Sequence, residues 1–182
     1  YYLTGPRLLA GTWVQGTWIV LSLITVFMGS MMAYREKVLK RRLAYSTVSQ
    51  VSYIMFGLAV MNSAAFTGAV LHLWVHALIK TMLFLMSGAV IHQTGHTRTD
   101  ELRGIGKEMP VTIWCYTLCS LGLIGIPPFG GFISKWHLAT GALVSGENPY
   151  FGIGPVILLI SALLTAAYLL PISIEGFLPG RD

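Results

Sequence analysis

Four titratable side chains in otherwise apolar segments are the residues best suited to do chemistry in this chain. His72, His76 and Lys80 follow one another at four-residue spacing within the apolar run 64–92, and Lys135 lies in a later apolar run. Ionisable groups cost roughly a few kcal/mol or more in hydrocarbon, so their presence indicates a functional site or a water-filled path. Histidine, and a lysine removed from water, can both exchange protons near neutral pH. This set of residues therefore predicts proton movement across a bilayer.

The four-residue spacing places His72, His76 and Lys80 on one face of a helix, as a stripe about 12 Å long. Lys80 lies near the middle of its run, where snorkelling to the membrane surface is difficult. A proton or ion path is the main interpretation. Polar packing between helices is a second, and haem or zinc ligation by the two histidines is a third, although zinc would need further ligands.

A break rich in glycine and proline interrupts the run 110–144, which is too long for one straight span. Pro127 and Pro128 lack backbone donors, and the glycines that follow permit unusual dihedrals. Broken helices are tolerated inside membranes where protein or a water-filled cavity satisfies the freed backbone, and transporters use such breaks for ion sites. We expect Lys135 in the first turn of a second half-helix. The alternative is an aqueous loop with an ordinary interfacial lysine.

Composition predicts the elements that must position these side chains. Hydrophobic residues make up 54% and charged residues 10% of the 182 residues, against a usual charged share of about 25%, and the mean hydropathy is +0.68. We predict an all-α, polytopic transmembrane helix bundle with about five spans and one broken helix near residues 125–131, forming a single transmembrane domain over 1–182. The expected spans are 17–34, 44–61, 64–92, 110–144 and 154–174. Segments 64–92 and 110–144 should pack side by side, with the stripe turned inward.

Basic residues predict the orientation of the bundle. Of the 12 lysines and arginines, two lie inside spans, and alternation of the spans puts nine of the others on one side and only Arg7 on the opposite side. By the positive-inside rule, the basic side faces the cytoplasm or its equivalent. The net charge of +5 therefore reflects topology, and nothing supports nucleic-acid binding. The nine residues are Arg35, Lys37, Lys40, Arg41, Arg42, Arg98, Arg103, Lys107 and Arg181.

Two weaker patterns have ordinary structural interpretations. Ser46, Thr47 and Ser49 suit a helix N-terminus, where their hydroxyls can cap free amides. Cys115 and Cys119 are four residues apart, and we interpret them as buried apolar packing residues. The sequence shows neither a dinucleotide fingerprint nor a cysteine cluster.

Three motifs in order resemble the antiporter-like proton-translocating membrane subunits of respiratory complex I (NADH:quinone oxidoreductase), Mrp cation/proton antiporters and membrane-bound hydrogenases. The resemblance covers roughly residues 17 to 175. One departure is Ser52, where the family motif usually has glycine, a small-for-small change. The motifs are Lys40–Gln50 (KRRLAYSTVSQ), His72–Lys80 (HLWVHALIK) with the following LFL, and Met109–Pro110 with Gly125–Trp136 (GIPPFGGFISKW).

The resemblance implies a proton route in which His72, His76 and Lys80 are connecting residues and Lys135 is the terminal proton-carrying lysine. It also implies that the chain matches only the C-terminal half of such a subunit, equivalent to its second repeat. We therefore expect a fragment of a larger protein, or a split gene. The other half of the family's subunits supplies a further Glu and Lys pair.

The expected function is proton translocation as a subunit of a redox-driven complex, of the NADH:quinone oxidoreductase or hydrogenase type. The alternatives are a sodium/proton antiporter subunit of the Mrp type and a structural membrane subunit. The resemblance implies a non-redox membrane subunit within an NADH:quinone oxidoreductase (translocase) complex, without cofactors of its own. Expected partners are other membrane subunits, the lipid bilayer, and protons with sodium as an alternative. The expected location is a bacterial or archaeal cell membrane, as a multi-pass protein.

Overall fold

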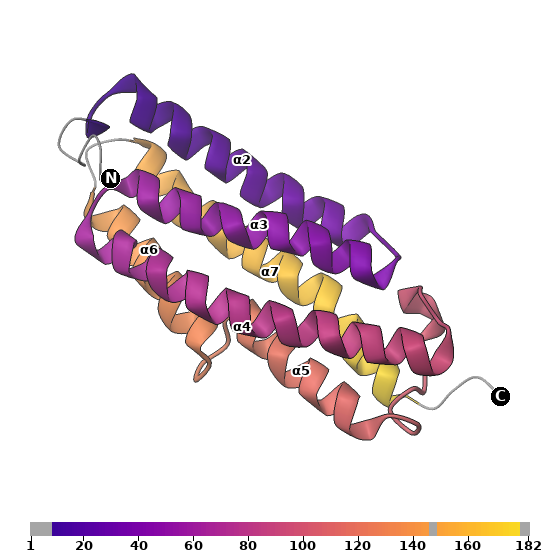
Figure 1. The fold of residues 1–182 in the computed structure, drawn as a ribbon. Coiled ribbons are helices and arrows are strands. Elements are labelled where there is room, and N and C mark those ends of the chain that lie inside the picture. Colours follow the sequence, from indigo (N-terminus) through magenta and orange to yellow (C-terminus); the bar gives the residue numbers. More distant parts are fainter. Residues whose placement is uncertain (1–8, 146–148, 179–182) are drawn as a thin grey trace.

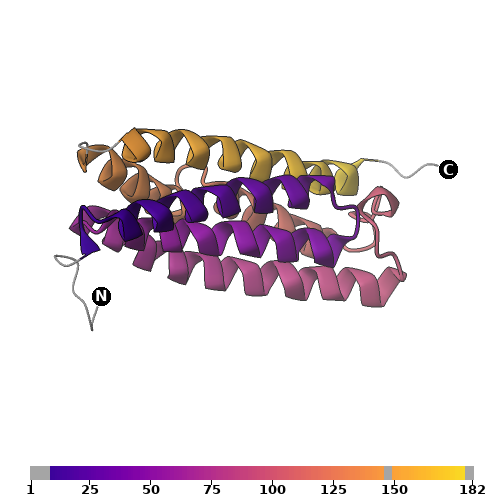
Figure 2. The same ribbon diagram turned by 90° about the horizontal axis from the view of Figure 1, so that it is seen from above.

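Helices dominate the computed structural model of the chain, which describes residues 9–145 and 149–178, the side chains of residues 149–151 excepted. In chain order they are α2 (Trp13–Arg35), α3 (Leu39–Val60), α4 (Ser63–Thr94), the short 3₁₀ helix η1 (Thr99–Glu101), α5 (Pro110–Ile124), α6 (Gly130–Val144) and α7 (Pro149–Phe177). The long helices run side by side with nearly parallel axes (Figure 1, Figure 2). The predicted all-α bundle is confirmed.

These helices occupy five membrane-spanning positions, because α5 and α6 share one of them. α2, α3, α4 and α7 are each long and apolar enough to cross a membrane. α5 and α6 have 15 residues each and follow one another along the bundle, so together they fill the fifth position (Figure 1). The predicted broken helix is confirmed, with the break between Ile124 and Gly130. Outside the bundle, side chains such as Leu78, Leu85 and Leu163 are exposed, as suits a protein surrounded by lipid.

The helices close into a ring. α3 packs between α2 and α4, α4 packs on both α5 and α6, and α7 closes the ring against α2, α5 and α6. The predicted packing of segments 64–92 and 110–144 is therefore confirmed. A closed ring lets one face of every helix point to a shared interior, where polar side chains are shielded from lipid by neighbouring helices.

The apolar interior of this ring has two separate clusters of buried side chains. One cluster includes Phe56, Ala65 and Leu138, and the other includes Leu43, Leu83 and Leu169. Buried polar side chains lie along the bundle beside and between the clusters. They include Ser46, Ser49, Gln50, His72, His76, Lys80, Ser134 and Ser161.

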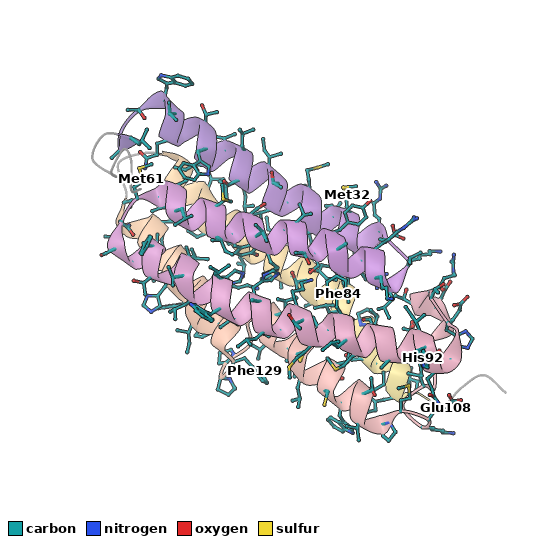
Figure 3. The ribbon with its side chains drawn as sticks, in the orientation of Figure 1. Met32, Met61, Phe84, His92, Glu108 and Phe129 are labelled. Carbon is teal, nitrogen blue, oxygen red and sulfur yellow. The ribbon has the colours of Figure 1, made fainter. Side chains whose placement is uncertain are left out.

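The basic residues gather at one end of the bundle, in its loops and in the adjoining ends of α2 and α3, and we call this end the basic end. It includes residues 36–38 and 95–109, whose backbones join through an antiparallel bridge between Val38 and Arg98. A hydrogen bond from Arg98 to Asp100 holds the pKa of the Asp100 carboxyl below its usual range. Figure 3 shows His92 and Glu108 at this end and Met61 at the opposite one.

This arrangement agrees with the predicted alternation of spans. Eight of the predicted nine basic residues belong to the basic end, while the ninth, Arg181, and the opposing Arg7 lie outside the described residues. The basic end is therefore the side that the positive-inside rule assigns to the cytoplasm or its equivalent.

The predicted helix N-terminus at Ser46, Thr47 and Ser49 was wrong. α3 begins at Leu39, whose amide donates to the carbonyl of Thr97, so the neighbouring loop satisfies a free helix-end amide without a serine cap. Ser46 and Ser49 lie inside the helix, and their hydroxyls bond to α7 and α2. The packing expected of the cysteines was also wrong for Cys115, which is exposed, while Cys119 is half-buried.

Candidate functional site

His72 lies at the centre of the polar interior and joins three helices. Its Nδ1 is 2.9 Å from the Ser134 hydroxyl of α6, and its Nε2 is 3.1 Å from Oε1 of Gln50 on α3. Its ring also stacks on Tyr53, with ring centroids 5.4 Å apart. Because His72 is 1% exposed, both ring nitrogens depend on these partners rather than on bulk water.

The Ser134 hydroxyl gives His72 two workable protonation states. Its oxygen lies 2.9 Å from His72 Nδ1 and 3.1 Å from the carbonyl of Gly131. When the imidazole is neutral, the hydroxyl can donate to Nδ1 while Nε2–H donates to Gln50. When the imidazole is protonated, Nδ1–H donates to the serine oxygen and the hydroxyl turns to Gly131. His72 can therefore gain a proton through rotation of one hydroxyl.

His76 and Lys80 continue the polar face along α4. The His76 ring stacks on His72, with ring centroids 6.2 Å apart. Lys80 donates from Nζ to the carbonyl of Leu43 at 3.0 Å and is 4% exposed. Within the described part of the chain, the buried Nε2 atoms of His76 and Gln50 have no hydrogen-bond partner. Buried polar atoms of this kind are usually satisfied by internal water, which suits proton transfer along this face.

Lys135 lies at the break between α5 and α6. Its ammonium group donates to the carbonyls of Leu123 and Ile124, at 2.7 and 2.8 Å, and lies 5.3 Å from the centroid of the Tyr53 ring. The last carbonyls of a helix lack partners within it and carry partial negative charge, so the end of α5 is a favourable place for a cation. The lysine thus supplies donors that the broken helix needs.

The predicted position of Lys135 needs a correction. α6 begins at Gly130, so Lys135 is its sixth residue and lies in the second turn. Helical side chains point back toward the N-terminus, which brings the ammonium group to the break. There it meets the last carbonyls of α5, which form the negative end of that helix.

Two glycines make the break compact. Gly125 ends α5 with φ of +90°, a conformation that L side chains rarely adopt. Gly131 packs so closely on the carbonyl of Gly122 that an added Cβ would collide with it. This close approach holds the start of α6 against the end of α5, and so holds Lys135 over the carbonyls that it binds. Phe129, at the break, lies part-way along the bundle (Figure 3).

Contacts with α3 show how deep each residue lies. His72 meets Gln50, which is halfway along α3, whereas Lys80 meets Leu43, four residues after the helix begins. At 1.5 Å per residue, Leu43, whose carbonyl binds the Lys80 ammonium, is about 6 Å from the start of α3 along its axis. α4 has 32 residues and extends past α3 at the basic end. Lys80 is therefore central in its own helix but close to the basic end of the bundle, and neighbouring helices bury it.

Together, His72, His76, Lys80 and Lys135 form what we call the histidine–lysine line. It begins at Lys80 near the basic end and passes His76 to reach His72. Ser134, the neighbour of Lys135 in sequence, then connects it to the helix break. The structure thus brings all four predicted residues into one connected region.

Sequence reasoning missed three side chains that hold this line together, namely Gln50, Tyr53 and Ser134. A signal for the first two was present, because Ser46, Ser49, Gln50 and Tyr53 recur at helical spacing within an apolar run. Ser134 gave no such signal. Among the described residues, no group of three or more His, Cys, Asp or Glu side chains could hold a metal ion.

Comparisons with known proteins identify a family and two related folds. The family described as "NADH:quinone oxidoreductase/Mrp antiporter, TM" matches residues 3–170. NADH-quinone oxidoreductase subunit N of Desulforudis audaxviator (strain MP104C) is 42% identical over 155 residues, which cover 85% of this chain and 30% of that protein. The chain thus spans about 30% of the length of this curated relative.

Two solved structures share the fold and more than a quarter of the aligned residues. A chain of the Mrp complex from Dietzia sp. DQ12-45-1b has a TM-score of 0.82 and 27% identity, covering 92% of this chain and 31% of that one. A chain of the membrane-bound sulfane sulfur reductase, an archaeal respiratory membrane complex, has a TM-score of 0.84 and 27% identity, covering 93% and 34%.

Proposed function

This chain belongs to the NADH:quinone oxidoreductase/Mrp antiporter transmembrane family, and on that premise we propose that it carries protons through part of a membrane subunit of a redox-driven complex. The site residues of the proposal are Lys80, His76, His72 and Lys135. The complex is of the NADH:quinone oxidoreductase type, in keeping with the relative that is 42% identical. Other membrane subunits of that complex are the proposed partners.

One observation carries the proposal. His72 contacts Ser134, the residue next to Lys135, and stacks on His76, which is followed one turn later by Lys80. Proton transfer needs hydrogen-bond contact, directly or through water, and three of these four side chains are almost fully buried. A purely structural polar cluster would not need four titratable groups in succession.

The proposal assigns a separate role to each end of the line. Lys80 exchanges protons near the basic end. Lys135 holds a proton at the helix break, where the carbonyls of Leu123 and Ile124 stabilise the charged form. Release of that proton removes the positive charge that those carbonyls stabilise and leaves two N–H donors, so the charge on Lys135 and the geometry of the break are coupled. We propose that the chain is one transmembrane domain, equivalent to the second repeat of a longer subunit.

Lys135→Ala in the full-length protein, assembled in its complex and reconstituted in liposomes, tests the proposal. We expect electron transfer to a quinone to continue in part while the associated proton uptake, followed with a pH-sensitive dye, is lost. The variant protein should still insert and assemble. Proton uptake at the wild-type rate in the Lys135→Ala complex would refute the proposal.

The Mrp-type alternative, a sodium/proton antiporter subunit, is favoured by the structural likeness to the Mrp complex. The same liposomes distinguish the two functions. A redox-driven pump acidifies or alkalinises the lumen only when the electron donor and quinone are present. An antiporter moves protons in response to an imposed sodium gradient without either reactant.

A further inference from the structure

The α5–α7 interface near the basic end contains a second group of buried polar atoms that the histidine–lysine line does not use. The side chains of Tyr116 and Ser120 on α5 and Ser173 on α7 are at most 3% exposed. The hydroxyls of Tyr116 and Ser120 lie near each other, but within the described residues none of the three hydroxyls makes a hydrogen bond of ordinary geometry. Buried hydroxyls without such a bond are costly, and internal water is the usual partner. Three such hydroxyls at one interface therefore point to water.

Helix packing places these hydroxyls close together. α5 and α7 run antiparallel, and Gly176 lies against the side chain of Ile113. One turn inward from that contact, α7 presents Ser173 and α5 presents Tyr116, since residues three apart share a helix face. Ser120 follows one further turn along the same face of α5.

Lys80 lies at the inner end of this group. The side chain of Ile79, its neighbour, reaches Gly122 on α5, so Ser120 and Lys80 lie at about the same depth. Only one donor of the Lys80 ammonium is used by the Leu43 carbonyl, whereas a charged lysine has three. Water beside Ser120 would meet the remaining donors.

Arg42 lies beside the group, between α3 and α7. It is 8% exposed, and its guanidinium donates to the carbonyls of Glu36 and Tyr168, at 2.8 and 2.9 Å. It also lines an open depression of about 380 Å³ at the basic end, with Lys37, Asp100 and Glu175 among the other lining residues. Tyr116 lies within electrostatic range of Arg42 and Tyr168. Ile172, the residue before Ser173, also lines this depression, so the three hydroxyls are close to a polar opening without lining it.

We propose that water held by the hydroxyls of Tyr116, Ser120 and Ser173 connects Lys80 with the aqueous phase at the basic end, beside Arg42. A hydronium ion that reaches the neutral Lys80 amine gives up its proton and becomes water, and the reverse step releases the proton. The inference rests on the proposed function, because it supplies the line with its exchange point. Tyr116 and Ser120 act on the proton through the water that they position.

Hydroxyl-radical footprinting of the full-length protein in its liposome-embedded complex tests for the water directly. Radicals generated by an X-ray pulse modify side chains that touch water, including internal water. We expect Tyr116 to be oxidised at least about threefold faster than Phe56, which is fully buried in the apolar cluster at the opposite half of the bundle. Equal resistance of Tyr116 and Phe56 would overturn the inference.

A double variant tests whether this water serves transport. Tyr116→Phe with Ser120→Ala removes both hydroxyls with little change of shape, and we expect proton uptake to fall severalfold. Ser161→Ala is the matched control, because this buried serine is hydrogen-bonded to Ser30 and is not one of the three hydroxyl residues of the proposal. Uptake at the control rate in the double variant would overturn the inference.

Failure of this inference and failure of the proposed function give different results. If the α5–α7 interface is dry while Lys135→Ala still abolishes proton uptake, only the proposed water connection between Lys80 and the basic end is wrong. If Lys135→Ala leaves uptake intact, the proposed function itself is wrong, whatever footprinting shows at Tyr116.

Discussion

Two buried polar regions of the same bundle differ in how completely their hydrogen bonds are satisfied. The serine cluster joins α2, α3 and α7 through the hydroxyls of Ser30, Ser49 and Ser161, with Ser30 Oγ 2.8 Å from Ser49 Oγ and 2.6 Å from Ser161 Oγ. Ser49 also lies within hydrogen-bonding distance of the Val26 carbonyl. The histidine–lysine line joins α3, α4 and α6, but the Nε2 atoms of His76 and Gln50 have no partner among the described residues.

This difference separates polar groups that hold helices together from polar groups that can do chemistry. The serine cluster has neither a titratable group nor a missing partner, and Gly29 lets α2 approach Ser49 closely enough to close it. Each change of charge on the histidine–lysine line, by contrast, requires its partners to rearrange or water to enter. Burial of a polar side chain in this bundle therefore indicates function only when the side chain also titrates or lacks a hydrogen-bond partner.

The largest expected effect is that of Lys135→Arg. Arginine keeps the positive charge and can still donate to the carbonyls of Leu123 and Ile124, but it cannot release its proton in the useful range. We expect proton uptake by the reconstituted complex to fall at least about a hundredfold. Substantial proton uptake by this variant would mean that a fixed positive charge suffices. Lys135 would then have a structural role, like the serine cluster.

Lys80 should show a smaller effect that depends on the replacement. Lys80→Ala removes the titratable group and should lower proton uptake about tenfold or more. Lys80→His should retain more activity, because imidazole can still carry a proton. Equal uptake in Lys80→Ala and the wild type would exclude Lys80 from the path.

His72→Gln tests the middle of the line. Glutamine can form hydrogen bonds to Ser134 and Gln50 but cannot carry a proton, so uptake should fall severalfold while the melting temperature changes little. If His72 only packs against its neighbours, as the serines do, His72→Gln should pump like the wild type. Proton uptake and thermal unfolding, measured on the same preparation, separate these outcomes.

Ser161→Ala should lower stability without lowering proton uptake, the reverse of the result expected for His72→Gln. Its effect on proton uptake should be the smallest of the four substitutions. Loss of its hydrogen bond to Ser30 should destabilise the bundle by about 1 kcal/mol, seen as a lower midpoint of denaturation in detergent. Proton uptake per assembled complex should stay at the wild-type value. A specific loss of uptake without a change in stability would place the serine cluster on a proton route and erase the contrast with the line.

Sequence reasoning reached the helical bundle, the broken helix and the four titratable side chains, because hydrocarbon leaves few options for polar groups. It did less well where a neighbour in space decides the outcome. Ser46 and Ser49 look like helix caps in the sequence, yet a loop carbonyl from Thr97 satisfies the start of α3 and frees them for contacts between helices. Arg42 was placed in a basic loop and is instead buried in the first turns of α3.

The sequence by itself determined which side chains are titratable, that they lie in apolar segments, and that proline and glycine interrupt one span. These properties follow from residue type and spacing alone. Only the tertiary structure decided that Lys135 faces the negative end of α5, that Lys80 lies near the basic end, and that Gln50 and Ser134 bracket His72. The reason is that depth and hydrogen-bond partners depend on how far each helix is shifted along its neighbours, and that shift is set by packing in the closed ring.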